Sequence, residues 1–373
     1  MIKINNYFND DLQKEFSTYI CNKIVCNKII NKFPEFATKP EIIKKIILWK
    51  PSVYSCGNSK PYDELDEQLT CYYKSALLLG YKDYKIKDCC HFFEVKKGKV
   101  YKLIFEQYRN KFLFNANPNI TDDYFPKSKK EFEEDIITPL DDYVKNINIE
   151  YKLDEIFDYK LIGKNWRNKI LADLNIEVCP YCNRQFINKY NYKGDKRVSA
   201  DLDHFIIKSK FPLFSLSLFN FIPSCQICNS RMKGQILRDV IYPFADGFDD
   251  DCYFSLVSKE NINKITLEQL FGLENISPMM KISRELNIKN LRIYNSVELY
   301  KLKELYETHS GYVKNLNIRK RVFDNDDYLK TLKSVLGENA THRNELQDYL
   351  YGCHEATSSV ILSKLTADIV NEK

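Results

Sequence analysis

Four cysteines in two CxxC pairs are the residues whose types and spacing most plainly predict chemistry. Cys179 and Cys182 flank a Pro-Tyr turn, and Cys225 and Cys228 repeat the spacing after 42 intervening residues. Two such pairs are typical of a tetrahedral zinc site with four thiolate ligands. Because four protein ligands leave no open position, we expect this zinc to be structural, not catalytic.

Polar residues between and after these cysteines suggest a second, hard metal site. Asp203 and His204 lie in an alternating stretch, residues 200–206, that predicts a strand, and Asn229 directly follows Cys228 at the start of a predicted helix. Carboxylate and amide oxygens suit Mg²⁺ or Mn²⁺. A histidine beside such an ion, with one ring nitrogen held by a backbone carbonyl, can act as general base on water. These are the parts of metal-assisted phosphodiester hydrolysis.

The succession CPYC, DLDHF, Asn220 and CNSRMKG resembles the HNH endonuclease superfamily, most closely the zinc-binding subgroup with two CxxC pairs around a ββα-metal core. The resemblance covers about 60 residues and implies a hairpin followed by a helix, with one divalent ion between them. It implies His204 as general base, with Asp203 and Asn229 as ligands of that ion. It also implies that Asn220 fixes the loop and orients the base.

The same resemblance places Lys233 one helical turn beyond Asn229, where it could contact phosphate or stabilise transition-state charge. Arg231 is a weaker candidate for this role. Each residue also has a structural alternative. His204 could be a hydrogen-bonded core histidine, Asp203 a cap or turn acid, and Asn220 a residue that satisfies a turn. The joint presence of these residues inside a zinc frame favours catalysis.

Positive charge is concentrated on the segment that carries these motifs. Residues 160–239 hold 14 Lys and Arg against 6 Asp and Glu, whereas the whole chain of 373 residues has a net charge of only +5. A phosphate backbone would have to lie along this segment, so the distribution favours a nucleic-acid partner. Lys208 and Lys210 are equally compatible with a solvated surface and with backbone contact. The acid-rich stretch 242–251 predicts a turn, with a second metal site as the less favoured alternative.

The segments on either side of the motifs read as amphipathic helices. Helices are expected from Pro40, over residues 64–79 with Gly80 as the stop, over 100–114, and from a Ser128–Glu131 capping box with a kink at Pro139. Helical spacing returns over residues 299–306, 327–336 and 358–370. We therefore predict a mainly helical α+β fold with a helical region at 1–170, a zinc-braced nuclease core at 171–260 and a second helical region at 261–373.

Composition limits the remaining choices. The apolar fraction of 44% allows a sizeable core, no run of 18 apolar residues predicts a membrane span, and the first residues lack a signal peptide. A cytoplasmic protein is expected, in which the other eight of the twelve cysteines have no metal role.

The leading hypothesis is an endonuclease that hydrolyses DNA. The resemblance further implies bacterial anti-phage defence, often with an ATPase partner. Two alternatives stay open: a zinc-stabilised nucleic-acid-binding or assembly subunit without catalysis, and the same chemistry on RNA. The lack of an RNA-recognition signature weighs mildly against RNA.

Overall fold

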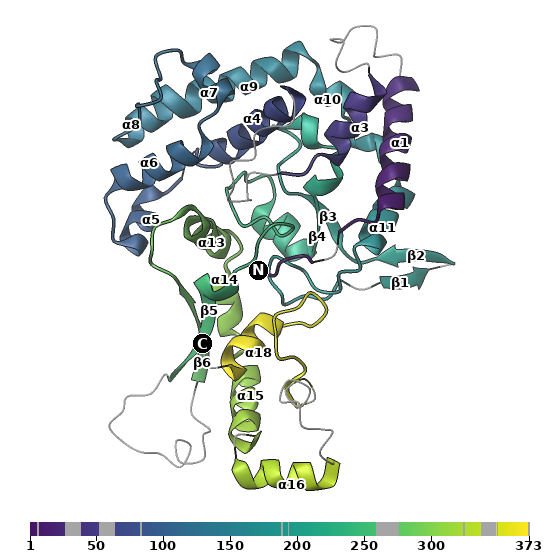
Figure 1. Cartoon of the computed structure of the whole chain (residues 1–373), viewed down its shortest axis with the longest axis vertical. Coiled ribbons are helices and arrows are strands. Elements are labelled where there is room, and N and C mark those ends of the chain that lie inside the picture. Colours follow the sequence, from purple (N-terminus) through teal and green to yellow (C-terminus); the bar gives the residue numbers. More distant parts are fainter. Residues whose placement is uncertain are drawn as a thin grey trace.

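The computed structural model in Figure 1 is mainly helical, with three antiparallel two-stranded sheets among the described residues. This agrees with the α+β prediction. The structure describes residues 1–5, 7–26, 39–51, 64–82, 84–187, 189–192, 194–258, 276–323, 325–336, 348 and 350–371. No helix in these ranges is both long enough and apolar enough to cross a membrane.

Helices of the first 173 residues form the upper part of the molecule in Figure 1. They are α1 (Asp10–Cys26), α3 (Pro40–Leu48), α4 (Glu64–Leu79), α5 (Ile86–Phe93), α6 (Lys97–Tyr108), α7 (Lys111–Ala116), α8 (Lys129–Glu131), η2 (Phe132–Ile137), α9 (Thr138–Glu150), α10 (Leu153–Ile156), η3 (Tyr159–Leu161) and α11 (Lys164–Asp173). The predicted starts at Pro40 and near residue 64 are confirmed.

Gly80 ends α4 as predicted, but for a different reason from the usual left-handed cap. A Cβ at this position would lie 2.9 Å from the backbone nitrogen of Asp239 and 3.0 Å from the carbonyl oxygen of Leu77. Glycine is therefore required by close backbone approach. The contact brings the end of α4 against Arg238 and Asp239, in the segment that follows the CNSRMKG motif.

Two of the expected helices are interrupted. The predicted helix 100–114 divides into α6 and α7, because the side chain of Asn110 accepts a hydrogen bond from the Phe112 amide and caps a new helix. The capping box is confirmed, since the Ser128 hydroxyl accepts from the Glu131 amide. The distortion expected at Pro139 takes the form of a π-helical turn, η2, directly before α9.

The central segment contains two hairpins and a short helix. Strands β1 (Lys189–Tyr192) and β2 (Asp195–Val198) form a hairpin that projects from the body, seen at the right of Figure 1. Strand β3 (Asp201–His204) confirms the predicted strand and pairs with β4 (Phe221–Ser224), with His204 opposite Phe221. The turns η4 (Pro212–Phe214) and η5 (Leu218–Asn220) lie between them, and the π-helical η6 (Ile227–Lys233) follows β4.

Most of the remaining elements form the lower part of Figure 1, and α13 lies higher, beside α5. The remaining elements are η7 (Asp249–Asp251), β5 (Cys252–Ser258), β6 (Ile276–Ile282), α13 (Ile288–Leu299), α14 (Leu302–Glu307), α15 (Ser310–Phe323), α16 (Asp326–Leu336) and α18 (Ser363–Val370). In the acid-rich stretch, Lys289 lies 3.6, 3.0 and 2.9 Å from the carboxylates of Asp246, Asp249 and Asp251. A lysine thus compensates these acids, in agreement with the turn interpretation.

One apolar cluster runs through all three predicted regions. Trp49 of the first region stacks on Phe214, which belongs to the loop between β3 and β4, and Tyr73 packs edge-on against the same ring. A buried polar network adds to this contact, because Asp239 accepts hydrogen bonds from Tyr81 and Arg292. The division at residues 170 and 260 stays a prediction, since the packing is continuous across both positions.

Candidate functional site: a four-cysteine centre beside the Asp203–His204 hairpin

The two CxxC pairs meet in space. The Sγ atoms of Cys179, Cys182, Cys225 and Cys228 all lie within 4.8 Å of one another, and all four residues are buried. In the described part of the chain, no other group of three or more His, Cys, Asp and Glu residues has this geometry. Sulfurs around a tetrahedral zinc lie about 3.8 Å apart when each metal–sulfur distance is about 2.3 Å. The cluster therefore fits a zinc ion, as predicted from the spacing.

Local backbone structure explains the cysteine geometry. The Cys179 carbonyl accepts from the Asn183 amide at 2.8 Å, which closes the first CxxC turn, and Asn183 takes a left-handed conformation with φ of 51°. In the second pair, the Cys228 amide lies 3.5 Å from the Cys225 sulfur. This second turn lies at the start of η6, so the sulfur cluster fixes where that helix begins.

Two acidic side chains on β3 face two side chains on η6. Asp201 and Asp203 lie on the same face of the strand because successive side chains alternate. The Asn229 side-chain amide donates to the Asp201 carboxylate at 3.1 Å, and the Lys233 ammonium contacts the Asp203 carboxylate at 2.7 Å. Strand β3 and helix η6 are therefore joined by two polar contacts about one helical turn apart.

The carboxylate of Asp203 is buried and engaged on both oxygens. Lys233 contacts Oδ1, and the Tyr181 hydroxyl donates to Oδ2 at 2.7 Å. Burial, followed by the Asp203 charge, raises the pKa of Tyr181 well above its ordinary value, so the phenol stays a donor. The Lys233 ammonium also donates to the His204 carbonyl at 2.5 Å and is itself buried. The predicted ligand Asp203 and the predicted phosphate contact Lys233 thus form an ion pair with each other.

Asn229 does not contact Asp203; its amide nitrogen is bonded to Asp201. Within the described chain, the amide oxygen of Asn229 and Oδ1 of Asp201 have no hydrogen-bond partner, so these two oxygens are free to bind a cation. Sequence reasoning did not select Asp201. Its position two residues before Asp203 in a predicted strand was the available signal, because alternation places both carboxylates on one face. Arg231 is exposed and lines a different cavity, together with Tyr84 and Arg238.

The side chain of His204 is held by a main-chain carbonyl. Its Nε2 lies 2.9 Å from the Ser215 oxygen. Because a carbonyl only accepts hydrogen bonds, Nε2 carries the proton and Nδ1 keeps its lone pair. Burial lowers the pKa of His204 to about 4, although the Ser215 contact opposes this shift. The imidazole is therefore neutral near pH 7 and able to accept a proton.

Asn220 holds the loop from which Ser215 approaches His204. Its side-chain oxygen accepts from the Ile206 amide at 2.7 Å, and its nitrogen donates to the carbonyls of Ile206 and Phe214 at 2.9 and 3.0 Å. The residue is buried and directly precedes β4. The contact with Phe214 fixes the residue next to Ser215, so Asn220 supports the orientation of His204 indirectly.

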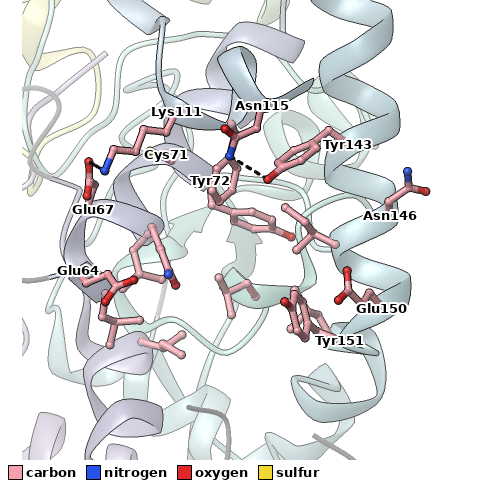
Figure 2. A pocket seen from close by; sticks show the side chains of 18 residues that line it. Glu64, Glu67, Cys71, Tyr72, Lys111, Asn115, Tyr143, Asn146, Glu150 and Tyr151 are labelled. Atoms are coloured by element: carbon pink, nitrogen blue, oxygen red, sulfur yellow. Dashed lines mark hydrogen bonds and ion pairs between the residues drawn. The ribbon is translucent and has the colours of Figure 1, made fainter. Parts of the chain in front are cut away.

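A cavity of about 880 Å³ lies between α4, α7 and α9, with Leu213 of the loop between β3 and β4 also on its lining. Figure 2 shows Lys111 paired with Glu67 and Asn115 bonded to Tyr143 on its wall, with Glu64 and Glu150 also on the lining. Three glutamates against one lysine give this rim a negative charge, which disfavours a phosphate backbone. Positive charge lies instead around the hairpin site.

Comparison with known proteins gives one partial similarity. The chain is similar to protein ea31 of Escherichia phage lambda, with 29% identity over 104 residues. The matched part is 26% of this chain and 31% of the phage protein, so the chain spans about a third of that relative's length. No family model and no solved structure matches the chain.

Proposed function

We propose that the chain is a metal-dependent endonuclease of the HNH type that hydrolyses phosphodiester bonds of DNA. The observation that carries the proposal is the state of His204. It is a neutral imidazole held by the Ser215 carbonyl at 2.9 Å, on a strand whose opposite face bears two carboxylates. The hairpin and the following helix begin beside the four-cysteine cluster. This combination matches the parts that phosphodiester hydrolysis requires.

In this proposal His204 takes a proton from the attacking water through Nδ1, while Nε2 keeps its bond to Ser215. The carbonyl contact holds the ring in one tautomer and one orientation, so no rearrangement is needed before proton transfer. Asn220 is a positioning residue, since it holds the loop and does not touch the reacting atoms. Its three hydrogen bonds with Ile206 and Phe214 support this role.

The catalytic cation would be Mg²⁺ or Mn²⁺, held by Asp203 and Asn229 with Asp201 as an additional ligand. The free oxygens of Asn229 and Asp201 fit a hard ion, and each Asp203 oxygen has a second lone pair beyond its observed contact. When bound, such an ion would neutralise charge at the scissile phosphate. Lys233 already shares the Asp203 charge at 2.7 Å, so its observed contacts favour a role in holding the strand end over direct phosphate binding.

The non-catalytic alternative has one observation in its favour. Both Asp203 oxygens are occupied by Lys233 and Tyr181, an arrangement that a purely structural ion pair would also adopt. A zinc-stabilised binding subunit would need the cysteine cluster and the basic segment but not the free Nδ1 of His204. His204 therefore distinguishes the nuclease from the non-catalytic binding subunit, because only the nuclease requires its ring.

The cellular setting is proposed on the resemblance alone. We propose a cytoplasmic enzyme of anti-phage defence with an ATPase partner. Because a cell must restrain such a nuclease, we predict that a partner or a low intrinsic affinity for DNA gates it, so that the purified protein alone cuts plain duplex weakly or not at all. RNA stays an alternative substrate, because a histidine base and one divalent ion act on either backbone.

The test compares wild type and His204→Ala on supercoiled plasmid, single-stranded DNA and RNA, with and without Mg²⁺ or Mn²⁺. We expect ion-dependent cutting of DNA that the variant loses by at least about a hundredfold, the usual scale of a general base. Zinc content at one per chain in both preparations is the control for folding. DNA binding without cutting by wild type, over long incubations with Mn²⁺, would favour the non-catalytic subunit.

A further inference from the structure

Two cations share one aromatic ring beside His204. The guanidinium carbon of Arg167 lies 4.7 Å from the centroid of the Tyr159 ring, and the Lys208 ammonium lies 3.9 Å from it. The Tyr159 ring is in turn 4.6 Å from the His204 ring, centroid to centroid, in an edge-on arrangement. Both cations are therefore one ring away from the candidate base.

Three separate segments produce this arrangement. Tyr159 lies in η3, Arg167 on the exposed side of α11, and Lys208 in the loop after β3. Figure 1 shows α11 beside the projecting β1–β2 hairpin, and β2 packs against this helix. The fold therefore brings Arg167, which precedes the predicted nuclease core, and Lys208, which lies inside it, to the same aromatic ring.

Neither cation has an ion-pair partner among the described residues. Several other surface lysines do have one, as Lys111 has with Glu67 at 2.7 Å. Asp158 and Asp201 are the acids that act electrostatically on Lys208 and Tyr159, and they do so without forming an ion pair. Holding two like charges against one ring costs electrostatic energy, which an anion bound beside them would recover.

We propose that Tyr159, Arg167 and Lys208 form a phosphate-binding clamp that holds the nucleic-acid backbone next to the scissile bond. Arginine matches two phosphate oxygens with its planar guanidinium, whereas lysine offers a point charge. Tyr159 positions both cations and packs against the base, so it links backbone binding to the reacting group. The clamp adds to the proposed function by placing the DNA backbone at one side of His204. The clamp rests on the proposed function in one respect, which is that His204 belongs to the active site.

The clamp is tested by binding measurements that need no cleavage. Fluorescence anisotropy of a short labelled DNA duplex, its single strand and the matching RNA is measured in EDTA at several salt concentrations. We expect the Arg167→Ala/Lys208→Ala variant to bind DNA several-fold more weakly. The slope of log affinity against log salt should become less negative by about 1 for each phosphate that the variant no longer neutralises.

Matched variants separate a clamp from a general loss of charge. Lys99→Ala/Lys127→Ala removes two other exposed cations and should leave affinity and slope near the wild-type values. Tyr159→Phe keeps the ring and should keep binding, whereas Tyr159→Leu should weaken it. An unchanged salt slope in the Arg167/Lys208 variant, or an equal loss in the control pair, would overturn the clamp.

The outcomes for the clamp and the nuclease are distinct. Cutting by wild type with unaltered binding by the Arg167/Lys208 variant removes the clamp and keeps the enzyme. Weaker binding by that variant, with no cutting by wild type, keeps the clamp and removes the proposed hydrolysis. Selective weakening of RNA binding alone would overturn DNA as the clamped substrate.

Discussion

The Asp203 carboxylate and the Lys233 ammonium form an ion pair that is almost completely removed from solvent, with side chains 4% and 3% exposed. Taking two charges out of water is costly, and the Tyr181 and His204 carbonyl contacts offset part of that cost by satisfying further lone pairs and protons. Removing one partner leaves the other charge buried and unpaired. A single substitution of Asp203 or Lys233 therefore changes stability and metal binding together, so a second variant is needed to distinguish the two effects.

We predict that Asp203→Asn lowers the free energy of unfolding by about 3 kcal/mol, the usual result of breaking a buried pair. Asp201→Asn should lower it by less than about 1 kcal/mol, because Asp201 is only half-buried. Urea denaturation of both variants measures the difference. An equal loss in the two variants would contradict the distinction between the buried pair and the half-buried acid.

The double variant Asp203→Asn/Lys233→Met separates the two roles of Asp203. It removes both charges and should recover most of the lost stability. If Asp203 is a metal ligand, the double variant stays inactive or needs much more Mg²⁺. Wild-type cleavage by the recovered protein at ordinary Mg²⁺ would remove Asp203 from the proposed ligands.

At the scale of elements, the loop between β3 and β4 is held by the hydrogen bonds of Asn220 and by aromatic packing. Asn220 bonds the amide and carbonyl of Ile206 and the carbonyl of Phe214, while Trp49 and Tyr73 pack on the Phe214 ring from the helical region. The loop presents the Ser215 carbonyl to His204. The orientation of the base thus depends on both a hydrogen-bonded turn and aromatic packing.

We predict that Asn220→Ala lowers the free energy of unfolding by about 2 kcal/mol, because it leaves buried backbone groups without partners. The turnover number should fall while the salt slope of DNA binding stays unchanged, since the base loses its orientation but the clamp does not. Asn110→Ala is the matched control: it removes a buried asparagine that bonds Tyr108 and Phe112, far from the site. A similar fall in turnover for the control would refute a specific positioning role.

The sequence was sufficient for features that depend on local spacing. The helix start at Pro40, the capping box at Ser128, the β3 strand and the four-cysteine cluster all follow from residues a few positions apart or from paired CxxC motifs. Contacts between distant segments were not predictable. Asp203 and Lys233 are 30 residues apart, and whether Asn229 reaches Asp201 or Asp203 depends on the register of η6 against the strand.

Residues outside the motif were missed for the same physical reason. Tyr159 and Arg167 precede the predicted core at residue 171, and nothing in their local pattern links them to His204. The break between α6 and α7 was also missed, because an asparagine cap inside an apolar run looks like a continuous helix. Contacts between residues that are distant in sequence thus determine these features, which the spacing of residues along the chain does not predict.

At the scale of the whole molecule, the first CxxC turn joins segments from both ends of the described chain. The Pro180 carbonyl accepts from the Ile2 amide at 2.9 Å, and the Cys182 carbonyl accepts from the Tyr306 hydroxyl at 2.7 Å. Asn183 bonds the C-terminal segment, accepting from the Lys364 amide at 3.1 Å. A metal that fixes this turn would therefore stabilise contacts far beyond the Asp203–His204 hairpin.

Removal of zinc from the cysteine cluster should affect segments far from the cluster. Chelation, or Cys182→Ser, should lower the melting temperature and increase amide hydrogen exchange in α18 as well as in η6, because both are attached to the CxxC turns. Structural zinc contributes on the order of 10 kcal/mol in small domains, so a large change is expected. Cys252→Ser is the matched control, a buried cysteine outside the cluster that should keep one zinc per chain. Full zinc content in Cys182→Ser, or exchange confined to η6, would contradict this long-range role.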